Sequence, residues 1–136
     1  MTRIKLFVAI LFLGLGLQQS YSQKYKFKTS GVSVLQKNEK GKWGKWSDLK
    51  LVNLVVTLDT DKSRIVVYSE RIQLFEIINY QPTKENDTDV VYPFVCRDND
   101  GEDCTVAIIT RKNQNNRKQL YITYKDHVIL YNIFTM

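Results

Sequence analysis

Between residues 24 and 134, apolar and polar side chains alternate along the chain in short runs with a period of two. In Lys24–Thr29, Tyr25 and Phe27 fall on one face and lysines on the other, and the rhythm continues after Gly31. Such alternation is typical of a strand that buries one face. We therefore predict a β-strand at the start of this region.

Further runs rich in β-branched and aromatic residues follow, separated by polar turns. The spacing of apolar residues in Ile72–Tyr80 would also suit a helix, but its composition favours a strand. Pro93 lacks a backbone donor, so its strand is expected at a sheet edge or with a bulge. The predicted runs are Leu49–Leu58, Arg64–Ser69, Ile72–Tyr80, Val90–Cys96, Cys104–Arg111, Gln119–Tyr124 and Val128–Phe134.

This pattern predicts an all-β fold. About eight strands at intervals of about 8–12 residues, with no convincing helix, are typical of a barrel or a sandwich. The short connections favour sequential antiparallel pairing, and hence an up-and-down meander that closes fully or partly into a barrel. A Greek-key sandwich is the alternative. No linker or repeat divides residues 23–136, so we expect a single domain.

The first 22 residues have the pattern of a cleavable signal peptide. A basic start precedes the apolar run Leu6–Leu17, and Ser20 and Ser22 supply the small residues before a cut ahead of Gln23. The apolar run is shorter than the roughly 20 residues that a membrane-spanning helix needs. We expect an exported protein, periplasmic or extracellular after cleavage.

The net charge of the chain changes these predictions of fold and export little. Loss of residues 1–22 would lower the formal net charge from +6 to +4, because Arg3 and Lys5 leave with them. The remaining basic residues cluster near one loop, which we interpret as a solvated turn, with an anionic glycan or lipid headgroup as the alternative partner. Without a recognition motif in an exported chain, we expect no nucleic-acid partner. The cluster consists of Arg111, Lys112, Arg117 and Lys118.

Cys96 and Cys104 flank a turn in which Gly101 suits a left-handed position, so they are expected opposite one another in a hairpin. In an exported protein an even number of cysteines favours a disulfide, which is the prediction here. The turn itself is acidic, and Asp98, Asp100 and Glu102 are weak candidates for a calcium site. The other interpretation is a solvated turn without metal.

Aromatic residues supply the candidate ligand-binding positions. Alternation places five of them inside a barrel, where they line a cavity or belong to the ordinary core. Trp43 and Trp46 lie in a polar, glycine-containing segment. We interpret one as closing the core or a barrel end and the other as lying on the surface, and stacking on sugars or anionic polymers is the alternative. The five inward candidates are Phe75, Tyr92, Phe94, Tyr121 and Tyr131.

Catalytic signatures are missing from the sequence: there is no Gly-x-Ser-x-Gly, no His-Glu-x-x-His and no glycine-rich phosphate loop. The single histidine, His127, has no nucleophile evident beside it. We therefore predict a protein that is not an enzyme and uses no cofactor.

The chain resembles small exported β-proteins of Bacteroidota that have no assigned function, and the resemblance implies export. In size and strand count it also resembles the calycins, the lipocalin-like barrels. Lipocalins carry a Gly-x-Trp motif near their first strand, whereas the Gly-x-Trp sequence at Gly41–Trp43 lies after the first strands of this chain. The pieces that carry the Bacteroidota resemblance are the segment ending before Gln23, Trp43 to Asp48, Arg64–Ser69, the Cys96–Cys104 hairpin, and Leu120–Ile122 with Tyr131–Asn132.

These observations lead to one functional hypothesis and one alternative. The hypothesis is a monomeric, non-enzymatic module that binds a small apolar molecule or an envelope component. The alternative is an interaction, inhibitor or structural envelope protein that acts through its loops. A barrel cavity of about 300 Å³ or more would favour the first.

Overall fold

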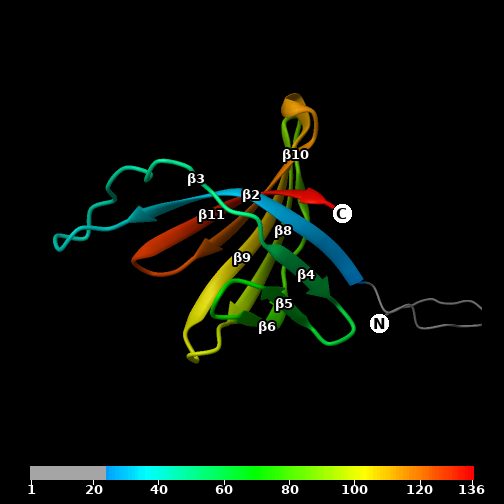
Figure 1. Cartoon of the computed structure of the whole chain (residues 1–136), viewed down its shortest axis with the longest axis horizontal. Coiled ribbons are helices and arrows are strands. Elements are labelled where there is room, and N and C mark those ends of the chain that lie inside the picture. Colours follow the sequence, from blue (N-terminus) through cyan, green and yellow to red (C-terminus); the bar gives the residue numbers. More distant parts are fainter. Residues whose placement is uncertain (1–23) are drawn as a thin grey trace, which may run out of the picture.

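The computed structural model describes residues 24–136, so the predicted signal segment 1–22 lies outside the described residues. The described chain forms an eight-stranded antiparallel barrel with two short extra strands (Figure 1). The barrel strands are β2 (Lys24–Gln36), β4 (Val55–Asp59), β5 (Arg64–Val67), β6 (Gln73–Tyr80), β8 (Asp89–Arg97), β9 (Asp103–Arg111), β10 (Arg117–Thr123) and β11 (His127–Thr135). The extra strands are β3 (Lys50–Leu51) and β7 (Lys84–Glu85), and a 3-10 turn, η1, spans Lys112–Gln114.

Each barrel strand pairs with the next barrel strand along the chain, and β11 pairs back to β2. This closure leaves the eight barrel strands without a free edge, which is how a barrel avoids exposing unpaired backbone groups. The all-β class and the closed meander are thus confirmed, and the Greek-key alternative is wrong. The strand at Ile72–Tyr80 is confirmed too, since β6 covers most of it.

Alternating side chains of all eight strands fill the barrel and form one core. Phe75 of β6 and Tyr131 of β11, two of the predicted cavity residues, belong to it and are 1% and 6% exposed. The Tyr131 hydroxyl accepts a hydrogen bond from Gln73 Nε2 at 3.2 Å, which satisfies its polar end. Both residues are core rather than cavity lining.

Two β-bulges set which side chains face inward. In β2, Gly31 lies opposite Asn132 and Thr29 opposite Ile133, so Ser30 is the extra residue. In β6 the register with β8 skips Ile78 in the same way. An extra residue reverses the alternation beyond it. The β6 bulge therefore brings Tyr80 to the same inward face as Ile77.

The predicted strand Leu49–Leu58 is interrupted, because β3 and β4 pair with different parts of β2. Thr29 fills the gap: its Oγ1 donates to the Val52 carbonyl at 3.1 Å and accepts from the Leu54 N–H at 2.8 Å. A buried side chain thus replaces ladder hydrogen bonds at the kink.

Pro93 lies in a strand that is paired on both sides, so the expected edge position is wrong and the bulge sits on the neighbouring β6 instead. The Pro93 carbonyl accepts from the Gln81 N–H at 3.1 Å, beyond the last β6 pair. The side of Pro93 that lacks a donor faces the same way, toward the residues that follow β6, so the β6–β8 ladder ends at this position.

In the described part of the chain, no helix is long and apolar enough to cross a membrane.

Candidate functional site at one end of the barrel

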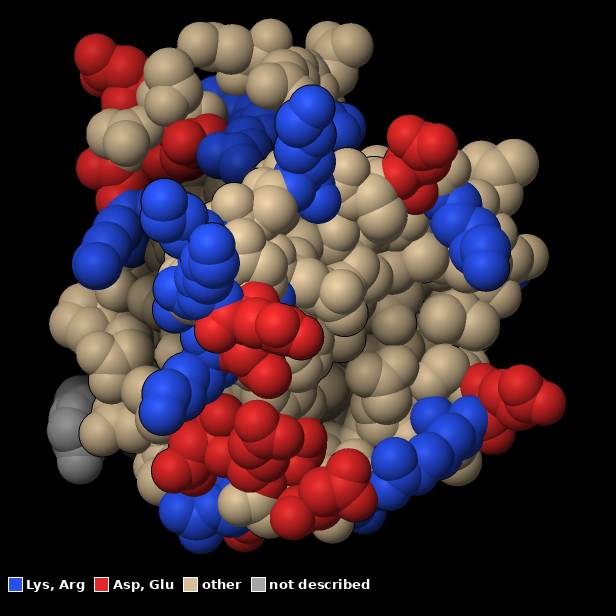
Figure 2. Space-filling model, turned by 90° about the vertical axis from the view of Figure 1, so that its left-hand side faces the viewer, with Lys and Arg blue, Asp and Glu red and all other residues tan. Residues whose placement is uncertain are grey.

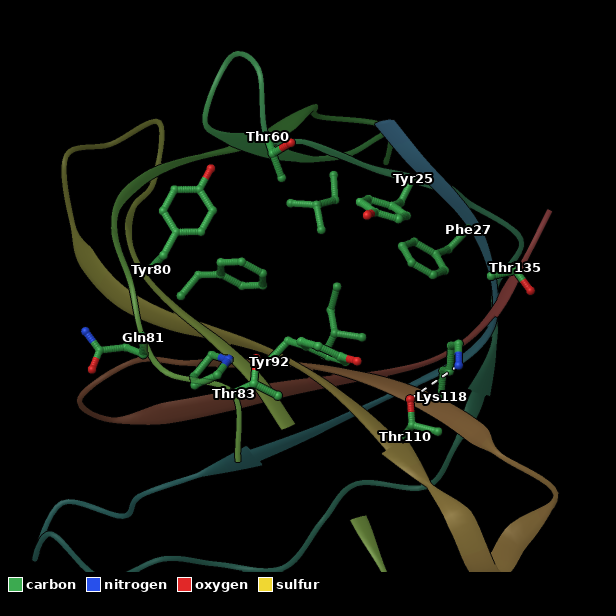
Figure 3. A pocket seen from close by; sticks show the side chains of 14 residues that line it. Tyr25, Phe27, Thr60, Tyr80, Gln81, Thr83, Tyr92, Thr110, Lys118 and Thr135 are labelled. Atoms are coloured by element: carbon green, nitrogen blue, oxygen red, sulfur yellow. Dashed lines mark hydrogen bonds between the residues drawn. The ribbon is translucent and has the colours of Figure 1, made fainter. Parts of the chain in front are cut away.

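One end of the barrel opens into a cavity of about 620 Å³, which we call the cup (Figure 3). Its walls come from the start of β2, the end of β4, the end of β6, the middle of β8, the end of β9, the start of β10 and the last residue of β11. The lining residues are Tyr25, Phe27, Leu58, Thr60, Tyr80, Gln81, Thr83, Tyr92, Pro93, Phe94, Ile108, Thr110, Lys118 and Thr135. The cup is thus built by inward positions of many strands rather than by one loop.

The floor of the cup is apolar and buried. Phe27, Leu58, Phe94 and Ile108 line it with exposures of only 5–7% and join the core beneath. Four strands contribute one residue each, so the floor is held by the barrel itself. Such a surface favours contact with an apolar molecule over water.

Three tyrosines form the rim: Tyr25, Tyr80 and Tyr92 are 44–47% exposed. Figure 3 shows their rings around the opening of the cup. A tyrosine at such a position presents an apolar ring to a ligand and keeps its hydroxyl near water. The rim is therefore suited to cover the body of a ligand that rests on the floor.

Tyr80 reaches the rim only because of the Ile78 bulge. Regular alternation from Phe75 and Ile77 would have turned Asn79 inward and Tyr80 outward. Bulges that re-aim a side chain are common near functional sites. Sequence reasoning missed Tyr80 for this reason, since an unpaired residue has no signal in the alternation.

Among residues 24–136, Lys118 is the one charged residue that lines the cup. It was expected in a basic turn, but it is the second residue of β10 and points inward with Leu120 and Ile122. Its Nζ donates to Thr110 Oγ1 at 3.3 Å, drawn as a dashed line in Figure 3. Sequence reasoning placed Lys118 in a turn rather than in a strand. Extending the period-two alternation of Leu120 and Ile122 back by two residues would have placed Lys118 on the inward face.

The structure brings two of the predicted ligand residues, Tyr92 and Phe94, together in the cup. Tyr121 is on the outer face. Arg111 Nη2 donates to the Tyr121 hydroxyl at 3.0 Å, and the Trp46 ring packs edge-on against the Tyr121 ring with centroids 6.3 Å apart. The prediction that Tyr121 faces the interior is wrong, because Leu120 and Ile122 occupy the inward positions of β10.

Neither tryptophan closes the core or a barrel end, so that interpretation is wrong. Trp43 and Trp46 lie between β2 and β3 and are 45% and 42% exposed. The ammonium of Lys37 lies 4.9 Å from the Trp43 ring centroid. The Val34 N–H donates to Ser47 Oγ, and this hydrogen bond holds the segment alongside β2. The two rings belong to the outer surface.

The register of β8 and β9 places Cys96 opposite Cys104, as predicted, but the predicted disulfide is not formed and both are free thiols. Burial, then the neighbouring Cys104, raises the pKa of Cys96 to about 12. Burial, then the charge of Asp98, raises the pKa of Cys104 to about 11. In the apolar core both sulfurs are held as protonated thiols, which are poor nucleophiles.

In the acidic turn, the carboxylates of Asp98 and Asp100 form hydrogen bonds and an ion pair within the protein. Gly101 has φ +80°, the left-handed position predicted for it. Asp98 Oδ1 accepts the N–H groups of Asp100 and Glu102, and its Oδ2 accepts the Tyr124 hydroxyl at 2.6 Å. Asp100 pairs with Arg71 at 2.8 Å. No group of three or more His, Cys, Asp or Glu side chains in residues 24–136 is arranged to hold a metal ion, including the calcium candidates.

The basic cluster does not form an open cationic patch. Arg111 pairs with Asp89 at 3.1 Å, and Lys112 pairs with Glu85 at 2.6 Å. On the face drawn in Figure 2, basic and acidic side chains lie next to one another. Arg117 donates to the side-chain oxygens of Gln114 and Asn132. Lys118 differs from the other three members of the cluster because it lines the cup.

No protein-family model, curated protein or solved structure matches this chain. The resemblances to exported Bacteroidota proteins and to calycins therefore stay predictions.

Proposed function

We propose that this protein is a non-enzymatic carrier that binds a small apolar molecule in the cup. The observation that supports the proposal best is the cavity of about 620 Å³ with a buried apolar floor. Ligand cavities in proteins usually measure about 300–1,000 Å³ and are lined mainly by apolar and aromatic side chains with a few polar groups. The cup has this size and this lining.

The rigidity of the cup supports the same function. Its floor residues are part of the barrel core, so they are held in place before a ligand arrives. A preformed site loses little conformational entropy on binding. Together with the pattern of residues 1–22, this leads us to propose a carrier that works outside the cytoplasm, as a monomer.

Fluorescence titration with the apolar dye N-phenyl-1-naphthylamine tests the proposal. We expect saturable binding with one dye per protein. Tyr92→Ala should weaken it about fivefold, because part of the apolar wall is lost, equivalent to about 1 kcal/mol. Tyr68→Ala is the matched control, since Tyr68 has a similar exposure of 47% and lies outside the cup. Absence of saturable binding by the folded protein would contradict the proposal.

A second candidate function is an interaction protein that acts through the segment between β2 and β4. The observation that favours it is the group of exposed apolar side chains there: Trp43, Trp46, Leu49 and Leu51, the last 84% exposed. Exposed apolar groups that cluster on a surface often mark contact sites. Loss of partner binding in Trp43→Ala together with unchanged dye binding would favour this function.

A further inference from the structure

We propose that the ligand of the cup is an amphipathic anion whose head group pairs with the Lys118 ammonium. This inference rests on the proposed function and adds to it the charge and orientation of the ligand. The chemical class is a molecule with an apolar or aromatic body and a single anionic head, such as a carboxylate or a phosphate.

The first argument is the position of Lys118. Its neighbours on the same face of β10, Leu120 and Ile122, are fully buried, so the inward direction of this face is fixed by the core. The pairing of Lys118 with Thr110 of β9 and with Ile133 of β11 places it between two paired strands rather than on a loop. The ammonium therefore stays at the wall of the cup, as Figure 3 shows.

The second argument is the absence of a protein counter-charge. No Asp or Glu lines the cup, and Lys118 forms no ion pair with any acidic residue of the described range 24–136. The neutral hydroxyl of Thr110 orients the ammonium at 3.3 Å without balancing its charge. Lys118 is half-buried at the wall of the cup, and a bound anion would supply the charge partner that the described lining does not.

Arg111 shows the contrast. It lies nearby in sequence and is partly covered too, but on the outer face it has Asp89 as its partner at 3.1 Å. Its Nε also donates to Gln119 Oε1 at 3.0 Å. The protein thus balances its partly buried outer cation internally, whereas the cation in the cup is left for a ligand.

The arrangement also orients the ligand. The apolar floor and the rim tyrosine Tyr25 would contact the body, while Lys118 and Thr110 would hold the head. A lysine is a compact point charge and does not impose the two-pronged geometry of an arginine. We therefore expect selection for negative charge rather than for one head-group shape.

Two dyes that differ by a single anionic group test the inference. 8-Anilinonaphthalene-1-sulfonate is N-phenyl-1-naphthylamine with an added sulfonate, so the ratio of their dissociation constants measures the preference for charge. Lys118→Met should weaken binding of the sulfonate dye about tenfold, because an interaction with a charged group is lost. Binding of the neutral dye should stay the same or tighten. Lys118→Arg should keep the preference.

Lys26→Met is the matched control, because Lys26 lies near the same end of β2 between the inward Tyr25 and Phe27 and is exposed on the outer face. It should leave the ratio unchanged. Equal effects of Lys118→Met on both dyes, or an effect of Lys26→Met as large as that of Lys118→Met, would overturn the inference while leaving the carrier function intact. Failure of the folded protein to bind either dye would instead overturn the carrier function and the inference with it.

Competition identifies the head group. Displacement of the sulfonate dye by decanoate supports a carboxylate ligand, and displacement by decyl phosphate supports a phosphate ligand. Displacement by the neutral decanol alone contradicts an anionic ligand. Circular dichroism of each variant confirms that the barrel is folded before its affinities are compared.

Discussion

The ring of Tyr80 meets the ring of Phe94 edge-on, with centroids 5.7 Å apart and planes at 79°. The two residues come from neighbouring strands and lie opposite one another in the register of β6 and β8. Tyr80 forms part of the rim of the cup and Phe94 part of its floor. This contact therefore joins the exposed part of the site to the core of the barrel.

A double-mutant cycle on Tyr80→Leu and Phe94→Leu should give a coupling free energy of about 0.5–1.5 kcal/mol in unfolding, as expected for an edge-to-face aromatic pair. Urea denaturation of the four proteins measures it. A cycle that pairs Phe94→Leu with Tyr68→Leu serves as the control, because Tyr68 lies outside the cup. Additive effects for Tyr80 and Phe94 would contradict the importance of the contact.

Thr29→Val should lower the free energy of unfolding by about 1–3 kcal/mol, because the Leu54 N–H and the Val52 carbonyl lose their partner. Valine keeps the shape of the side chain, which is only 2% exposed, so cavity formation does not explain such a loss. Thr29→Ser retains the hydroxyl and should be closer to the wild type. Urea denaturation compares the three proteins; a loss in the serine variant equal to that in the valine variant would speak against the hydrogen bonds.

The thiols of Cys96 and Cys104 should react slowly with Ellman's reagent in the folded protein at pH 7.5 and rapidly in urea. Their pKa values of about 12 and about 11 keep them protonated when folded. Because these values are raised, their contribution to stability is present below the ordinary pKa of about 8.5 and is lost as the pH rises above it. Stability should thus fall less between pH 8 and 10 in a Cys96→Ala, Cys104→Ala variant. Rapid labelling of the native protein would disprove this description of the pair.

Asp98 should contribute to the acid sensitivity of the protein. Burial alone would raise its pKa, but hydrogen bonds from the Tyr124 hydroxyl and from two backbone N–H groups outweigh this and hold the pKa below its ordinary value. The stability that the carboxylate contributes is then present above about pH 4 and lost as the pH falls through the lowered pKa. Asp98→Asn should lose less stability than the wild type between pH 5 and 2, measured by the urea midpoint. Asp87→Asn, a change at an exposed carboxylate, should behave like the wild type.

Alternation was sufficient to predict the barrel, since most of the strands between β6 and β11 alternate buried and more exposed residues and follow one another through short turns. It also identified Tyr92 and Phe94, because β8 alternates without interruption into the cup. It had no means of separating the cup from the core, so Phe75 and Tyr131 were included with equal weight. Depth along the barrel depends on register between strands, which a single sequence does not show.

The remaining differences have local causes. An unpaired residue, Ile78, moved Tyr80 inward, and a threonine hydroxyl divided the strand predicted at Leu49–Leu58. Lys118 was placed in a turn because its neighbours are polar, although it begins an apolar-faced strand. In each case tertiary pairing, rather than composition, decided the outcome.

The pairing of β2 with β11 has a consequence for the chain while it is still being synthesised. The first strand of the barrel finds its partner only when the last strand has been made, a separation of about a hundred residues along the chain. Until then β2 and β10 each present an open backbone edge, which is a template for aggregation. We expect a chain truncated before His127 to aggregate rather than to remain as a soluble seven-stranded sheet. The newly made chain is therefore at its most vulnerable just before its last strand is added.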